Sequence, residues 1–188
     1  SKLLEYDLLK RGMISIGEFE LKEGDSNIYH NLEKLNSITP LTIDRTLDVN
    51  WANDISESDF SHTFLSLVTE TLSDNKILFL SEKIWKPIYL GHPFLLIGNP
   101  YTLKYLKSKG YKTFDKWWDE SYDNDSDVNV RIQKVADILA LLENKSIDEL
   151  KELRNEMMEI CRYNQQHFNN QVDLRYKLDA GDYNPQHS

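Results

Sequence analysis

Ser81, Glu82 and Lys83 have the clearest chemical potential in this chain, because they directly follow a strand-like run at residues 76–80. Serine is a preferred N-cap, and a helix that begins at such a cap presents backbone N–H groups and the positive end of its dipole. Lys83 adds a full positive charge to the same turn. We therefore expect a strand at residues 76–80 to lead into a helix whose N-terminus binds a phosphate group.

Glu82 and Lys83 are neighbours on the first turn of this expected helix, so their side chains point in different directions. One can face a phosphate while the other accepts hydrogen bonds from hydroxyl groups, a division that suits a nucleotide-sugar. The alternative interpretation is an ordinary solvated Glu–Lys pair at the start of a helix. Pro87 removes one hydrogen bond inside the helix, which predicts a kink or an early end near Lys86.

Strand-like and helix-like segments alternate around this junction. Residues 63–69 and the continuous apolar run at residues 93–97 have the composition of strands, and residues 111–114 suggest an edge strand. A second helix is expected over residues 98–109, with Gly110 closing it. The alternation predicts an α/β fold with a Rossmann-like parallel sheet covered by helices, whose ligands lie beyond the carboxyl ends of the strands.

The N-terminal part of the chain is expected to contribute further elements to the same lobe. An opening helix is followed by a short strand at residues 13–16, a short helix at residues 27–35 and irregular backbone at residues 36–59. No repeat, low-complexity block or linker interrupts the sequence. We therefore predict a single lobe over residues 1–178, followed by a polar tail at residues 179–188.

The C-terminal part is predicted to form two amphipathic helices that cover the sheet. Apolar residues follow a helical period over residues 128–142 and again over residues 147–160. Ser146 and Glu149 have the spacing of a capping box, which marks the start of the second helix.

The composition of the 188 residues restricts the partners of this protein. The formal net charge of −9 argues against broad contact with nucleic acid or an anionic membrane, and leaves room only for a small local basic site. The longest apolar runs, at residues 77–80 and 94–97, are far shorter than the roughly 20 residues that cross a bilayer. Cys161 is the only cysteine, so no internal disulfide can form. We expect a cytoplasmic protein without a membrane span, with Cys161 in buried helix packing.

Three segments in this order resemble a known family. They are Thr-Glu-Thr at residues 69–71, Phe-Leu-Ser-Glu-Lys-Ile-Trp at residues 79–85 and Gly-His-Pro-Phe-Leu-Leu-Ile-Gly at residues 91–98. Their order and spacing resemble the donor-binding segment of the α1,3-fucosyltransferases and related GT-B glycosyltransferases. The chain is also similar to uncharacterised viral and bacterial sugar-transferase-like proteins at residues 110–114 and 119–123.

The resemblance implies a set of donor-binding residues. These are Glu70, Thr71, Phe79, Ser81, Glu82 and Lys83. By the same resemblance, Lys83 contacts the donor pyrophosphate, Glu82 the hydroxyls of the ribose or sugar, and Glu70 lies beside the transferred sugar. Phe79 replaces a tyrosine of the family, so it can pack on the nucleotide but cannot hydrogen-bond to it. Thr71 stands where the family has asparagine.

The resemblance further implies a GT-B-type C-terminal lobe that acts in an inverting transfer. An acceptor hydroxyl, on a glycan or another molecule, is deprotonated by a carboxylate and attacks the anomeric carbon as the nucleoside diphosphate leaves. Acceptor and catalytic base come from a preceding lobe in this family, so no catalytic residue is assigned here. Lys83 and the helix N-terminus stabilise the departing charge, and no metal or other cofactor is expected.

Residues 123–127, Asp-Asn-Asp-Ser-Asp, offer a competing metal site. Their alternating carboxylates resemble the start of an EF-hand loop, but Val128 stands where that loop needs glycine and Lys134 where it needs glutamate. A metal-dependent transferase that uses Asp123 and Asp125 remains an alternative. The stronger interpretation makes Asp127 the N-cap of the following helix.

The remaining candidates are expected to have structural roles. Arg131 is predicted to pair with an acid of residues 119–125, although it could be a second phosphate ligand. His92 is predicted to lie in a turn, with the lining of a donor cleft as the alternative. The tryptophans are expected to pack in the core, as is usual for this residue. The alternative to a transferase is a non-catalytic α/β module that binds a protein or glycan partner.

Overall fold

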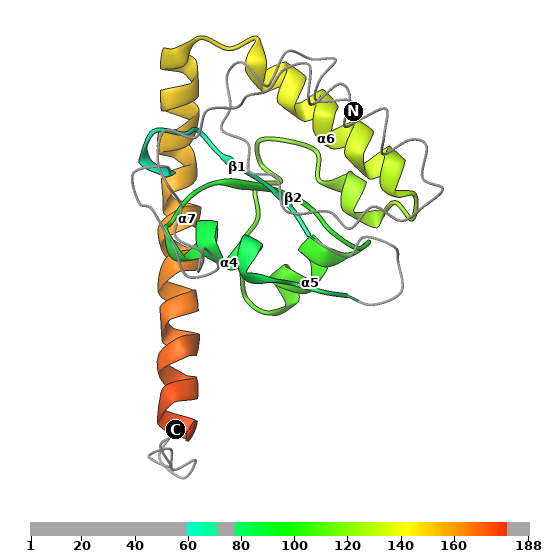
Figure 1. Ribbon diagram of the computed structural model, residues 1–188. Helices are drawn as coiled ribbons and strands as arrows, with labels where there is room; N and C mark the ends of the chain where they lie inside the picture. Colours follow the sequence, from blue (N-terminus) through cyan, green and yellow to red (C-terminus); the bar gives the residue numbers. More distant parts are fainter. Residues whose placement is uncertain (1–59, 71–77, 180–188) are drawn as a thin grey trace, which may run out of the picture. The chain divides into compact units, whose positions relative to one another are not determined.

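The computed structural model describes residues 60–70 and 78–179, with side chains up to residue 172. Figure 1 shows how the elements of this part are arranged. In chain order they are β1 (Ser66–Thr69), α4 (Glu82–Tyr89), β2 (Phe94–Ile97), α5 (Thr102–Ser108), the 3₁₀ helix η2 (Ser121–Asn124), α6 (Val128–Glu143) and α7 (Ile147–Asp179). The elements expected within residues 1–59, the tail from residue 180 and the candidate residue Thr71 lie outside the described residues.

β1 and β2 form a parallel pair, with α4 between them in the chain. Ser66 is aligned with Phe94 and Thr69 with Ile97. The ladder continues by one residue, because the backbone N–H of Glu70 donates to the carbonyl oxygen of Ile97 at 2.9 Å. Within the described residues the chain is therefore α/β, with one parallel two-stranded sheet, as the alternating pattern predicts at its coarsest level.

The strand expected at residues 76–80 is not present in its described portion. Residues 78–80 have no strand conformation. Leu78 and Phe79 are exposed, while Leu80 packs against the core. A strand needs a hydrogen-bonding neighbour, and in the described part of the chain β2 pairs with β1 instead. The strand expected over residues 63–69 is confirmed only from Ser66 onward.

α4 begins where the sequence predicts. Ser81 is the N-cap in an extended conformation, and its hydroxyl oxygen accepts a hydrogen bond from the backbone N–H of Lys83 at 3.3 Å. Of the kink or early end expected near Lys86, the early end is wrong, because α4 continues through Pro87 to Tyr89. Pro87 removes a single intrahelical hydrogen bond, and its side chain is buried on the core-facing side of the helix.

α5 starts later than expected, at Thr102, because Tyr101 adopts a left-handed conformation with φ of 67°. Gly110 follows the helix with φ of 88°, which confirms its predicted closing role. The edge strand expected at residues 111–114 is wrong. The side chain of Asn164 in α7 takes both backbone groups of Lys112, accepting from its N–H and donating to its carbonyl oxygen at 2.8 Å each.

α6 and α7 confirm the two predicted C-terminal helices. Asp127 is the N-cap of α6 and accepts from the backbone N–H of Asn129 at 2.8 Å. The capping box is also present, since Glu149 accepts from the N–H of Ser146 at 2.7 Å and donates its own N–H to the Ser146 hydroxyl oxygen at 3.2 Å. In Figure 1 the sheet lies between α7 and α6.

The core joins α4, the sheet and the C-terminal helices. Ile84 and Ile88 of α4 are buried with β2 and with Met157 and Cys161 of α7. Cys161 therefore has the packing role expected from the sequence, and burial raises the pKa of its thiol to about 12. Trp85 stacks on Phe168 of α7, with 5.8 Å between the ring centroids. No helix among residues 60–70 and 78–179 combines the length and apolarity that a bilayer crossing requires.

Candidate functional site

The carboxyl end of β1 and the start of α4 meet through Glu70 and Ser81. Glu70 is 6% exposed, and its Oε2 accepts a hydrogen bond from the Ser81 hydroxyl at 2.6 Å. Its Oε1 accepts from the Ser81 backbone N–H at 3.1 Å. Two residues that lie eleven positions apart in the sequence thereby form one polar cluster at the carboxyl end of the sheet, where parallel α/β sheets bind ligands.

Lys83 brings a positive charge to this cluster. Its Nζ lies 3.5 Å from the Ser81 hydroxyl oxygen and 3.7 Å from Oε1 of Glu82. The side chains of Lys83 and Glu82 are both about half exposed, so the pair can reach a ligand in solution. Lys83 therefore lies on the first turn of α4, beside the N-cap, as the sequence predicts.

The backbone at this helix start is only partly available to a ligand. Ser81 accepts from the N–H of Lys83, so that amide is capped rather than free. The first four amides of an α-helix have no partner within the helix, and the helix dipole makes this end favourable for negative charge. Anion binding at this helix start stays a prediction, and one of the backbone donors is already used by the cap.

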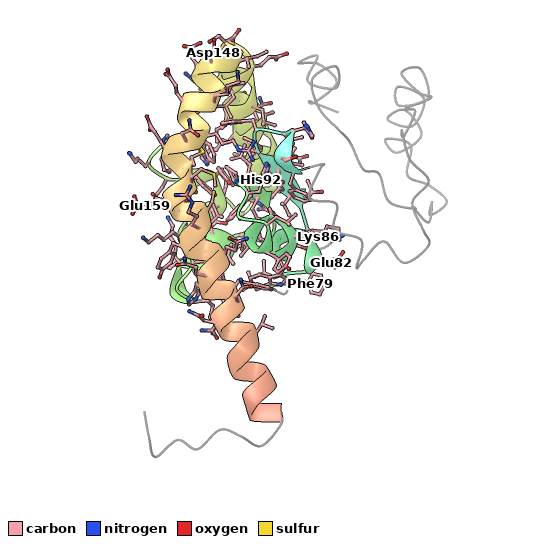
Figure 2. The ribbon with its side chains drawn as sticks, turned by 90° about the vertical axis from the view of Figure 1, so that its left-hand side faces the viewer. Phe79, Glu82, Lys86, His92, Asp148 and Glu159 are labelled. Carbon is pink, nitrogen blue, oxygen red and sulfur yellow. The ribbon has the colours of Figure 1, made fainter. Side chains whose placement is uncertain are left out.

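Phe79 and Glu82 extend the cluster toward solvent. Phe79 is 39% exposed, and Figure 2 shows it beside Glu82 near the start of α4. An exposed aromatic ring can stack on a flat apolar group of a ligand. Five of the six residues expected to bind a donor thus lie at or just before the start of α4 or at the end of β1: Glu70, Phe79, Ser81, Glu82 and Lys83.

Asn99 is a polar residue at the same edge of the sheet that sequence reasoning missed. It lies two positions after the end of β2 and is 3% exposed. Neither its side-chain oxygen nor its side-chain nitrogen has a hydrogen-bond partner. A buried amide without partners is unfavourable by about 1–3 kcal/mol, and such groups often mark positions where a ligand or water completes the hydrogen bonding. The sequence shows the asparagine in Gly98-Asn99-Pro100, but it does not show that the side chain is buried.

Asp123, which the sequence offers as a candidate metal ligand, caps the N-terminus of α5 although it lies 20 positions after Leu103 in the sequence. Its two carboxylate oxygens accept from the backbone N–H groups of Leu103 and Lys104 at 3.0 and 3.1 Å. Burial raises the pKa of this carboxyl group, while the two amides oppose the shift. Asp125 accepts from the N–H of Asp127 at 3.1 Å. The carboxylates of residues 123–127 therefore organise helix starts.

Arg131 is almost fully buried behind these acids. Its Nη1 donates to the backbone carbonyl oxygen of Asp125 at 2.6 Å. Burial lowers the pKa of the guanidinium, and the carboxylates of Asp123, Asp125 and Asp127 oppose that shift. The expected partnership of Arg131 with this acidic segment is confirmed by its hydrogen bond to Asp125 and by the electrostatic effect of the neighbouring carboxylates.

His92 lies away from the donor-site candidates, at the end of the sheet where the strands begin. Figure 2 shows it well separated from Phe79 and Glu82. Its Nε2 lies 3.0 Å from the carbonyl oxygen of Thr63, which can only accept, so Nε2 carries the proton. Nδ1 then accepts from the Ser66 hydroxyl at 3.0 Å. Burial lowers the pKa of this histidine, so its neutral form is favoured.

An open depression of about 430 Å³ lies beside His92 rather than beside Ser81. Its lining includes Tyr89 and Arg154. The guanidinium of Arg154 donates to the carbonyl oxygens of Ser61 at 3.2 Å and Phe60 at 3.5 Å, which ties the segment before β1 to α7. None of the residues expected to bind a donor lines this depression.

Comparisons with known proteins assign no family to this chain. No family model matches it, and neither the curated proteins nor the solved structures contain a match. The site is therefore interpreted from its own geometry.

Proposed function

We propose that this chain is the donor-binding lobe of an inverting, fucosyltransferase-like glycosyltransferase that uses a nucleoside-diphosphate sugar. The observation that carries the proposal is the Glu70–Ser81–Lys83 cluster at the carboxyl end of β1. In the proposal, the parallel pair with α4 is part of a Rossmann-like sheet in a GT-B-type lobe. A parallel sheet of this kind recognises phosphate where a helix starts beyond a strand end.

The proposed roles follow from position and charge. Lys83 and the N-terminal amides of α4 bind the diphosphate, and Glu82 accepts hydrogen bonds from sugar or ribose hydroxyls. Glu70 holds Ser81 in place through two hydrogen bonds, with its carboxylate at the edge where the sugar is expected. Phe79 offers its exposed ring to the nucleotide base.

The proposed reaction is a displacement at the anomeric carbon. The acceptor oxygen forms a bond to this carbon while the bond to the diphosphate oxygen breaks, and the leaving nucleoside diphosphate takes the electron pair. The proton of the acceptor passes to a carboxylate, which this proposal places outside the described residues. Lys83 and the start of α4 stabilise the negative charge on the leaving group, because preorganised donors there need no rearrangement during the reaction.

Titration calorimetry with GDP, UDP and ADP tests the proposal directly. We expect binding of at least one of them, weakened about 10-fold or more by Lys83→Ala, since a charge-assisted hydrogen bond contributes about 1.5–3 kcal/mol. Glu82→Ala should weaken binding of the nucleotide-sugar more than that of the free diphosphate. Lys151→Ala is the matched control, because it removes an exposed lysine on α7.

The same titration separates the alternatives. Binding that disappears with a chelator would favour the metal-dependent transferase that uses Asp123 and Asp125. A folded protein with no nucleotide binding, or with binding that Lys83→Ala leaves unchanged, would overturn the proposal and favour a non-catalytic α/β module for a protein or glycan partner.

A further inference from the structure

Four exposed lysines on α5 and the segment that follows it are each placed over an aromatic ring. The ammonium groups lie 4.2–5.5 Å from the ring centroids, within the range of a cation–π interaction. The pairs are Lys104 with Tyr101, Lys109 with Tyr105, Lys112 with Tyr163 and Lys116 with Trp117. These eight residues are called the lysine–aromatic face below.

Three contacts hold the segment of this face along α7. The carbonyl oxygen of Lys109 accepts from Nε2 of His167 at 2.7 Å, and Asn164 holds the backbone of Lys112. Trp117 donates its indole N–H to Glu156 at 2.9 Å. Residues 156 and 167 are separated by about 16 Å along an α-helix, so Lys109, Lys112 and Lys116 follow one another in a row.

The face is basic although the protein is acidic. Residues 101–118 contain five lysines and a single acid, Asp115, in a chain with a net charge of −9. Lys107, the fifth lysine, is neutralised by Asp115 at 2.8 Å and Glu120 at 3.1 Å. The other four lysines outnumber the two further carboxylates that bind residues of the face, Glu156 at the Trp117 indole and Asp123 at the Lys104 backbone N–H. Acids that lie more than about 8–10 Å away are screened at physiological salt.

We propose that the lysine–aromatic face docks this protein on a bilayer surface that contains anionic phospholipids. Tyrosine and tryptophan are the residues that prefer the headgroup level of a bilayer, and lysines beside them can reach the lipid phosphates. Tyr101 is 52% exposed, and Tyr105 and Tyr163 are also exposed. The docking is peripheral and uses no part of the proposed donor site.

The geometry favours a bilayer over a single-stranded nucleic acid. Nucleic-acid binding to aromatic residues needs free ring faces for base stacking, usually in a groove. Here one face of each ring already carries an ammonium group. The depression described above also shares no residue with the lysine–aromatic face.

Vesicle co-sedimentation of the whole chain tests this inference. We expect binding to phosphatidylcholine vesicles that contain phosphatidylserine and little binding to phosphatidylcholine alone. Each lysine near an anionic surface changes the partition coefficient about fivefold, so Lys109→Ala with Lys112→Ala should weaken binding about 25-fold. Raising the salt from about 0.1 M to 1 M shortens the screening length from about 10 Å to 3 Å and should release the protein.

The matched control is the double variant Lys145→Ala with Lys151→Ala, which removes the same charge near the turn between α6 and α7. Circular dichroism confirms that each variant is folded. The inference is overturned if both double variants bind alike, if anionic lipid has no effect, or if a single-stranded oligonucleotide binds this face more tightly than the vesicles do.

Discussion

The hydroxyl of Ser81 donates to Oε2 of Glu70 over 2.6 Å, so a side chain at the end of β1 fixes the first residue of the turn into α4. The same hydroxyl oxygen accepts from the backbone N–H of Lys83. Glu70 therefore orients the cap, and the cap orients the helix start that carries Lys83. Glu70 and Ser81 can therefore be tested for their effect on the stability of the junction, separately from the binding that is proposed for Lys83.

A double-mutant cycle should detect this connection in the free energy of unfolding. Glu70→Ala and Ser81→Ala should each destabilise the protein by about 1–3 kcal/mol, because the first leaves the partly buried Ser81 and the second the buried Glu70 without their mutual hydrogen bond. The double variant should lose less stability than the sum of the losses in the two single variants, with a coupling free energy of about 0.5–3 kcal/mol. Urea denaturation measures these differences. Glu70→Gln should retain most of the stability, since an amide can also satisfy Ser81.

Glu159→Ala is the control for this cycle, because it removes an exposed carboxylate from α7, well separated from Glu82 in Figure 2. It should change the stability by less than about 0.5 kcal/mol. Strict additivity of Glu70→Ala and Ser81→Ala would show that the two residues do not act as a unit.

His92 should make stability depend on pH on the acidic side of neutrality. Burial lowers the pKa of this histidine in the folded state. Between the unfolded pKa of about 6.5 and the lower folded pKa, the unfolded chain binds more protons, so the free energy of unfolding decreases as the pH falls through this window. Above the unfolded pKa the effect is absent. Thermal unfolding at pH 7 and pH 5 measures it.

His92→Gln should reduce the loss of stability between pH 7 and pH 5, at the expense of lower stability at pH 7. An unchanged loss in His92→Gln would mean that other groups titrate in this window.

Asn164 should stabilise the segment at residues 111–114, because its side chain forms hydrogen bonds of the kind that a neighbouring strand would otherwise form. Asn164→Ala removes two hydrogen bonds of 2.8 Å to the backbone of Lys112 and should destabilise the protein by about 2 kcal/mol. Asn164→Asp keeps the acceptor and loses the donor, so it should lie between wild type and Asn164→Ala. Urea denaturation measures these differences, with the exposed Asn170→Ala as control. A loss no larger than that of Asn170→Ala would contradict this role.

Features decided by neighbours in the sequence were predictable. Ser81 and Asp127 cap their helices through amides two residues away, and the capping box of Ser146 and Glu149 spans three. The parallel pairing was also foreseeable, because an apolar run at residues 94–97 suits a strand buried on both faces.

Features that depend on residues distant in the sequence could not be predicted from it. Residues 78–80 have strand-like composition, but a strand forms only where another strand pairs with it, and among the described residues only β1 and β2 are paired. Residues 111–114 were assigned to an edge strand because nothing local indicates that Asn164, 52 positions later, binds their backbone.

The candidate site was predictable only in part, because some of its features depend on neighbouring residues and others on distant ones. Ser81 and Lys83 could be placed at a helix start from local spacing, whereas the closeness of Glu70 to them was suggested by the family resemblance. The buried amide of Asn99 could not be predicted, because its isolation from hydrogen-bond partners depends on packing around the end of β2.

The guanidinium of Arg154 has a consequence for the order in which this protein can fold. It reaches backward across 93 positions to Ser61, just ahead of β1. At a synthesis rate of about 5–20 residues per second, the ribosome needs roughly 5 to 20 s to deliver that arginine after the serine has emerged. During this interval the segment just ahead of β1 lacks its two hydrogen bonds to Arg154, so its attachment to α7 forms later than the parallel strands themselves are synthesised.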